Sequence, residues 1–140
     1  METTELLKVL FQQMKQERAA LAHMIELLED DGFNPEIFVR EQKVYIYIEC
    51  DDSHYSIETT SKGYKLVASY VDWDYGETHD IKVIERVHAE TIINNINLIG
   101  ENLDYYYDMY LIEKAEWKQR RKQLRRNQVI KELSVNNTSA

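Results

Sequence analysis

The densest collection of groups that could do chemistry is the segment Asp72-Trp73-Asp74-Tyr75-Gly76-Glu77-Thr78-His79-Asp80. Its carboxylates and imidazole are possible ligands for a divalent cation. An EF-hand loop that began at Asp72 would need glycine at its sixth position and glutamate at its twelfth, and the chain has Glu77 and Val83 there. We therefore expect no metal. The same mixture suits protein recognition, in which aromatic side chains anchor and carboxylates steer, although a solvated hairpin loop without function explains it equally well.

The rest of the sequence contains no recognisable catalytic motif. The four histidines fall at no known metal spacing, no nucleophile elbow is present, and the four glycines form no phosphate-binding loop. We expect no enzyme and no cofactor. The remaining alternative is an enzyme whose site is assembled only in space, which would need a deep pocket with paired titratable groups.

Cys50 is the only thiol, so an internal disulfide is excluded and a reducing compartment is expected. It ends an alternating apolar segment and is typical of a small buried residue. The N-terminus METTELLKVL carries neither a basic region nor a long apolar run, and no stretch approaches the ~20 apolar residues of a membrane span. These features predict a cytoplasmic protein without a membrane partner.

The net charge of −8 is distributed unevenly. Residues 1–113 contain 23 acidic and 9 basic side chains, whereas residues 114–140 contain 2 acidic and 8 basic ones. An acidic surface repels nucleic acid and attracts proteins that bind nucleic acid, and a basic helix does the reverse. The larger part of the chain therefore favours a protein partner.

The elements that must position these groups begin with an amphipathic helix over residues 3–29. Its apolar stripe comprises Leu7, Leu10, Met14, Leu21, Met24 and Leu28, widened by Phe11 and Ile25. Gly32, followed by Asn34 and Pro35, is expected to end the helix. Glu29, Asp30 and Asp31 precede this end, where the helix dipole disfavours negative charge, so they are either solvated acids or a patch kept for a partner.

Between Ile37 and Val87 the apolar period changes to two, which is typical of strands. Alternation over residues 44–50, 55–59, 64–70 and 81–83 predicts four strands, with 37–40 as an uncertain fifth. Short polar turns at residues 51–53 and 61–63 predict an antiparallel meander with the helices on one face. The expected buried face holds Val44, Ile46 and Ile48, and the opposite face holds Tyr45, Tyr47, Lys65, Val67 and Val71.

A second helix is predicted over residues 89–133. Its heptad stripe comprises Ile92, Ile96, Ile99, Leu103, Tyr106, Tyr110 and Trp117. At 1.5 Å per residue this helix would be about 67 Å long, too long for one globule. It should therefore break, at Gly100, or project and pair with a second copy. We expect a homodimer through Tyr106, Tyr110, Trp117 and Leu124.

The end of this helix is basic, with Lys118, Arg120, Arg121, Lys122, Arg125 and Arg126. Like charges four residues apart each oppose the helix by ~0.2 to 0.5 kcal/mol, so a compensating interaction is expected. Candidates are the helix dipole, the pair Glu116 with Arg120, and acidic residues of the first helix such as Glu17 or Glu26, in the same copy or a second one.

These observations predict an α+β fold with a long N-terminal helix, an antiparallel meander of four or five strands and a long C-terminal helix. We expect one domain over residues 1–133, followed by a disordered tail over residues 134–140. In general character, small, acidic and tyrosine-rich, the chain resembles proteins with which phages and mobile elements block host enzymes. That likeness covers no defined positions and assigns no residue.

The leading hypothesis is a non-enzymatic binding protein that inhibits or regulates a nucleic-acid-handling host enzyme. It would present carboxylates and aromatic rings where the partner expects phosphates and bases. The expected contact residues are Asp51, Asp52, Asp72, Trp73, Asp74, Tyr75, Glu77 and Asp80. The alternative is a nucleic-acid-binding regulator that uses the basic helical segment.

Overall fold

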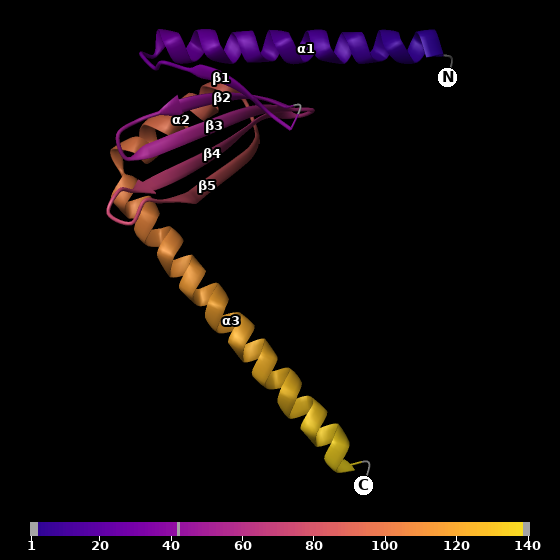
Figure 1. Ribbon diagram of the computed structural model, residues 1–140, viewed down its shortest axis with the longest axis vertical. Helices are drawn as coiled ribbons and strands as arrows, with labels where there is room; N and C mark the ends of the chain where they lie inside the picture. The colour runs from indigo at the N-terminus through magenta and orange to yellow at the C-terminus, as the bar shows by residue number, and fades with distance from the viewer. Residues whose placement is uncertain (1–2, 42, 139–140) are drawn as a thin grey trace. The chain divides into compact units, whose positions relative to one another are not determined.

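The chain is helix, five strands and two further helices, as the α+β prediction required (Figure 1). The computed structural model describes residues 3–41 and 43–138, without the side chains of residues 6, 10, 11 and 135–138. The elements are α1 (Thr3–Asp30), β1 (Glu36–Arg40), β2 (Lys43–Glu49), β3 (Ser53–Thr60), β4 (Gly63–Asp72), β5 (Glu77–Val87), α2 (Ala89–Glu101) and α3 (Leu103–Thr138). They form two units, Met1–Leu103, which we call the body, and Asp104–Ala140. A single domain over residues 1–133 stays a prediction.

Helix α1 ends where its sequence predicts. Gly32 has a φ of 89°, and the amide of Phe33 donates to the carbonyl of Leu28 at 3.0 Å, which is the Schellman pattern of a glycine-terminated helix. Among the described residues of the apolar stripe, the buried ones are Leu21, Met24 and Leu28, all in the C-terminal half of the helix. In the first half Leu7 and Met14 are exposed, and the side chains of Leu10 and Phe11 lie outside the described part of the chain.

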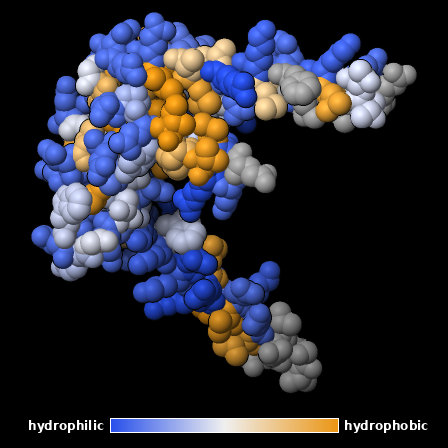
Figure 2. All heavy atoms as spheres, turned by 45° about the horizontal axis from the view of Figure 1, so that its top comes forward, coloured by the Kyte–Doolittle hydropathy of each residue, from blue (hydrophilic) through white to orange (hydrophobic). Residues whose placement is uncertain are grey.

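The five strands form one antiparallel sheet in the order β1-β2-β3-β4-β5, so the uncertain strand at residues 37–40 is a true member. Ile46 faces Ile57, and Ile57 faces Leu66, across neighbouring strands, and all three are fully buried. The helices α1 and α2 pack on this face against β3 and β4. The face over β1 is less well covered, because Ile37 and Val39 remain exposed there. Figure 2 shows apolar side chains gathering on the body next to α1.

A bulge in β5 interrupts its pairing with β4 but leaves the faces of β4 unchanged. Between the pairs Ala68–Lys82 and Ser69–Asp80, β4 advances by one residue and β5 by two, so the extra residue is Ile81. The pairing of β4 with β3 is continuous from Gly63 to Tyr70. Alternation along β4 therefore places Val71, which is only 7% exposed, on the same face as Lys65 and Val67, where it was expected.

Helix α2 supplies the rest of the core through Ile92, Ile96 and Ile99, as the heptad pattern predicted. The predicted break at Gly100 is wrong by two residues, because Gly100 remains helical and the helix stops at Asn102. There φ is −125° and the Asn102 side-chain amide donates to the carbonyl of Leu98 at 2.9 Å. This side-chain bond to the backbone competes with continuation of the helix, as asparagine commonly does.

Helix α3 continues to Thr138, so residues 134–138 of the expected tail are helical, while residues 139–140 lie outside the described chain. Every residue from Leu111 to Ser134 is exposed. Among the described residues, no helix combines the length and the apolar character needed to cross a membrane.

Candidate functional site

The β4–β5 loop is held against the β2–β3 turn by two hydrogen bonds. The backbone amide of Val71 donates to the carbonyl of Asp52 at 3.0 Å, and the indole N–H of Trp73 donates to the carbonyl of Asp51 at 3.0 Å. The N–H is the only polar group of the indole, and it is used in this internal hydrogen bond, while Trp73 stays 65% exposed. The two acidic segments that the sequence identified separately are therefore one surface.

Within the loop, local bonds fix the chain without neutralising its charge. The amide of Asp74 donates to the Asp72 carboxylate at 3.1 Å, and Gly76 takes the positive φ of 65° that the turn requires. Asp72 and Glu77 are paired directly across the hairpin, where two like charges oppose each other. Tyr75 at the tip is 79% exposed. In the described part of the chain no lysine or arginine pairs with these carboxylates, so the loop presents aromatic rings between negative charges.

More carboxylates gather around this loop than sequence reasoning assigned to it. In a meander the start of β1, the β2–β3 turn and the β4–β5 turn lie at the same end of the sheet. The ends of α1 and α2 meet there too, since the Asn97 side-chain amide donates to the Asp31 carboxylate at 2.9 Å. We call this surface the acidic end and define it by Asp31, Glu36, Glu49, Asp51, Asp52, Asp72, Asp74, Glu77 and Glu101.

Two hollows flank the β2–β3 turn at the acidic end. One of about 350 Å³ is lined by residues that include Glu36, Glu49, Asp51 and Trp73. The other, of about 330 Å³, lies between that turn and the end of α2, with Asn97 and Glu101 in its lining. The segments 31–36, 49–54, 72–79 and 97–103 contain no lysine or arginine. The surface is therefore uneven and of a single charge sign.

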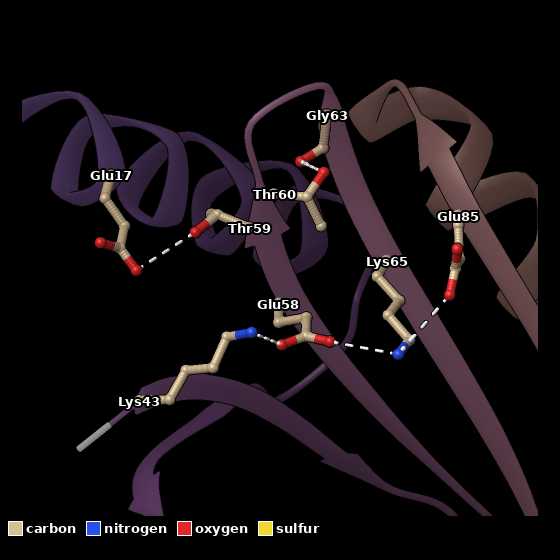
Figure 3. Close-up of polar contacts among 8 residues, drawn as sticks. All are labelled: Glu17, Lys43, Glu58, Thr59, Thr60, Gly63, Lys65 and Glu85. Atoms are coloured by element: carbon tan, nitrogen blue, oxygen red, sulfur yellow. Dashed lines mark hydrogen bonds and ion pairs between the residues drawn. The ribbon is translucent and has the colours of Figure 1, made fainter. Parts of the chain in front are cut away.

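The cations of the body lie elsewhere, and some are neutralised within the fold. Figure 3 shows Glu58 between Lys43 and Lys65, with Glu85 beyond Lys65. Lys65 lies 3.6 Å from both carboxylates, and the hydrogen bond to Glu58 raises the pKa of Lys43. These contacts join β2, β3, β4 and β5 on the face opposite the helices. The remaining cations lie on α1, at the end of β1, in the β3–β4 turn and along β5.

Asp80 is the one carboxylate among the predicted contact residues that does not belong to the acidic end. Its carboxylate accepts a hydrogen bond from the Ser69 hydroxyl at 2.7 Å, further along β5. His79, its neighbour, lies 3.3 Å from the Glu77 carboxylate. Asp80 therefore stabilises the pairing of β4 with β5. His79 lies closer to the acidic end.

The register also places a histidine, a serine and an aspartate side by side on three strands, which sequence spacing did not reveal. His54 is opposite Ser69, and Ser69 is opposite Asp80. A nucleophilic triad needs the imidazole between the hydroxyl and the carboxylate. Here the hydroxyl lies between the other two and donates directly to Asp80, so this order does not activate Ser69.

In the part of the chain that the structure covers, no three side chains of His, Cys, Asp or Glu converge as a metal site would require. No family model, characterised protein or solved structure matches the chain.

Cys50 is half-buried between the two hollows, and we expect its thiol to react slowly. Burial raises the pKa of Cys50 and Asp51 raises it further, against a hydrogen bond with Ser53. Less thiolate is then present near pH 8 than for an unperturbed cysteine. Ellman's reagent at pH 8 should react several-fold more slowly with the folded protein than with the protein in urea. Equal rates in both states would show that neither burial nor Asp51 protects the thiol.

The predicted dimerisation residues lie on α3 and stay untested. Tyr106 and Tyr110 are half-buried, whereas Trp117 and Leu124 are 56% and 67% exposed. The expected compensation by Glu116 and Arg120 is not formed, since no ion pair joins these two described residues. Arg121 instead lies over the Trp117 ring at 4.5 Å. A homodimer through this stripe remains a prediction, which light scattering would test against the monomer mass of 16.7 kDa.

Proposed function

We propose that this protein is a non-enzymatic binding protein whose acidic end docks on a partner protein that handles nucleic acid, and inhibits or regulates it. The observation that carries the proposal is the hydrogen bond from Trp73 to the Asp51 carbonyl, which joins two acidic turns into one surface with an exposed ring at its centre. A nucleic-acid-binding site offers cations for phosphates and flat apolar surfaces for bases. The acidic end offers the complementary groups.

The arrangement of charge supports this class of partner. Because no lysine or arginine lies in the segments of the acidic end, its field is not cancelled locally and steers a basic surface toward it. Trp73 and Tyr75 can then bury apolar area at low conformational cost, as aromatic anchors at interfaces do. Asp51, Asp52, Asp72, Asp74 and Glu77 supply the charge. The protein would thus act as a nucleic-acid mimic in the cytoplasm, the compartment that a lone thiol favours.

Capture from host-cell lysate tests the proposal. The immobilised chain is compared with the variant Asp72→Asn/Asp74→Asn/Glu77→Gln, after nuclease treatment of the lysate. The Asp72→Asn change retains a side-chain oxygen that can accept the backbone amide of residue 74, so the turn should persist. We expect the wild type to retain a nucleic-acid-binding protein that the variant loses. Equal recovery on both chains would place the partner site elsewhere.

A further inference from the structure

Helix α3 carries a continuous stripe of cations along one side. Lys114, Lys118, Arg121 and Arg125 follow one another at steps of four, three and four residues, which places them on one face of an α-helix. Lys122 and Arg126 widen this face, and we call these six residues the basic stripe. Arg120 points about 160° away from the centre of the basic stripe, at 100° per residue. All six residues of the stripe are exposed.

The charge of the basic stripe is not neutralised by the residues that the structure describes. None of the six cations takes part in an ion pair with a described carboxylate. Two of them lie over aromatic rings instead, with Arg121 4.5 Å from the centre of Trp117 and Lys114 5.8 Å from that of Tyr110. A ring orients a cation without removing its charge. Like charges one turn apart therefore remain and favour an external polyanion.

We propose that the basic stripe binds the phosphate backbone of nucleic acid without regard to sequence. The stripe covers about 18 Å of helix, and duplex DNA presents a negative charge every ~1.7 Å along its axis. Successive cations from Lys114 to Arg125 are about 4.5 to 6 Å apart along the helix. A duplex presents about ten negative charges over 18 Å, so each of the six cations can face a phosphate. Arginine, which supplies three of the six, also binds phosphate through two parallel hydrogen bonds.

Two other polyanions fit this helix less well. A helix that lies on an anionic membrane needs an apolar face opposite its cations. The side opposite this stripe carries one apolar residue, Leu124, among Glu116, Gln119, Arg120, Gln123 and Asn127. An acidic protein surface, such as that of a second copy, offers carboxylates in an irregular cluster. Acidic residues begin again at Glu113, directly before Lys114, and continue with Asp108 and Asp104 toward the start of α3, so the contact should end near Lys114.

The test is fluorescence anisotropy of a labelled 20-base-pair duplex of arbitrary sequence with the full chain at several NaCl concentrations. Six phosphate contacts give a slope of about −5 for the logarithm of affinity against that of salt, so doubling the salt weakens binding about 30-fold. The variant Lys118→Gln/Arg121→Gln/Arg125→Gln should lower that slope by about three. Glutamine has nearly the helix propensity of the residues it replaces, and circular dichroism verifies that the helix persists.

Arg120→Gln is the matched control, because it removes one cation from the same turns but from the other side of α3. It should change the slope by less than one. The proposal is overturned if no binding occurs at 50 mM NaCl, or if Arg120→Gln weakens binding as much as Arg121→Gln alone. It is also overturned if the triple variant loses binding only to phosphatidylserine vesicles, or only self-association in light scattering.

Binding of nucleic acid by the basic stripe is expected to be independent of partner binding by the acidic end. The variant Asp72→Asn/Asp74→Asn/Glu77→Gln should leave the salt slope on the duplex unchanged, since those residues belong to the body. Capture of the protein partner should in turn survive neutralisation of the basic stripe. Each proposal can therefore fail alone.

Discussion

Replacing Trp73 by alanine is expected to weaken partner binding by at least about 30-fold, equivalent to ~2 kcal/mol. Two effects act together. The exposed ring is lost as an anchor, and the hydrogen bond that ties the β4–β5 loop to the Asp51 carbonyl is lost with it. The free energy of unfolding should change by less than ~1 kcal/mol, because the ring is largely outside the core. Titration of the purified partner against both chains measures the effect.

Trp73→Phe separates the two contributions, since it keeps an aromatic ring and removes the N–H donor. We expect an affinity between those of the wild type and the alanine variant. The chain has only two tryptophans, so in a Trp117→Phe background the emission reports Trp73 alone. Partner binding should shift that emission to shorter wavelength as the ring leaves water. An unshifted spectrum on saturation with partner would mean that Trp73 is not at the interface.

The largest effect on stability is expected for Ile96→Ala, at about 2 to 5 kcal/mol of the free energy of unfolding. Ile96 lies in the middle of α2 and is 2% exposed among the core side chains. Truncation leaves a cavity in a core that only two helices and one face of a sheet build. Since small domains are stable by about 5 to 15 kcal/mol in total, the variant should unfold at a much lower urea concentration.

Leu98→Ala is the matched control for this core substitution. Leucine and isoleucine side chains contain the same number of carbon atoms, and Leu98 lies two residues along the same helix but is 48% exposed. We expect a change below ~1 kcal/mol, partly offset by the higher helix propensity of alanine. Equal destabilisation by the two substitutions would contradict the packing of α2 described above.

The fold could be predicted from the sequence where local pattern and tertiary packing agree. Alternation identified the strands, and Gly32 marked the end of α1 because a positive φ leaves little choice of residue. The misplaced helix break arose where one residue overrides the pattern. A side-chain cap such as that of Asn102 carries almost no periodic signal.

The candidate site was only partly predictable, for a different reason. The loop at residues 72–80 was identified from its composition, but its bond to Asp51 joins residues 22 positions apart and depends on the loop conformation. The carboxylates of Glu36, Glu49 and Glu101 were missed. In a meander, the start of β1 and the end of β2 lie at the same end of the sheet as the β4–β5 loop. The predicted strand order could therefore have placed Glu36 and Glu49 beside the loop.

The central claim, that the acidic end is the partner surface, is tested most directly by the affinity of the purified partner for two charge-matched variants. Asp72→Asn/Asp74→Asn/Glu77→Gln removes three charges at the acidic end, and Glu5→Gln/Glu41→Gln/Glu90→Gln removes three elsewhere on the body. We predict that the first loses at least about tenfold in affinity, with slower association and a weaker salt dependence, and that the second binds as the wild type does. If the two variants bind the partner equally well, the acidic end is not the surface that recognises it.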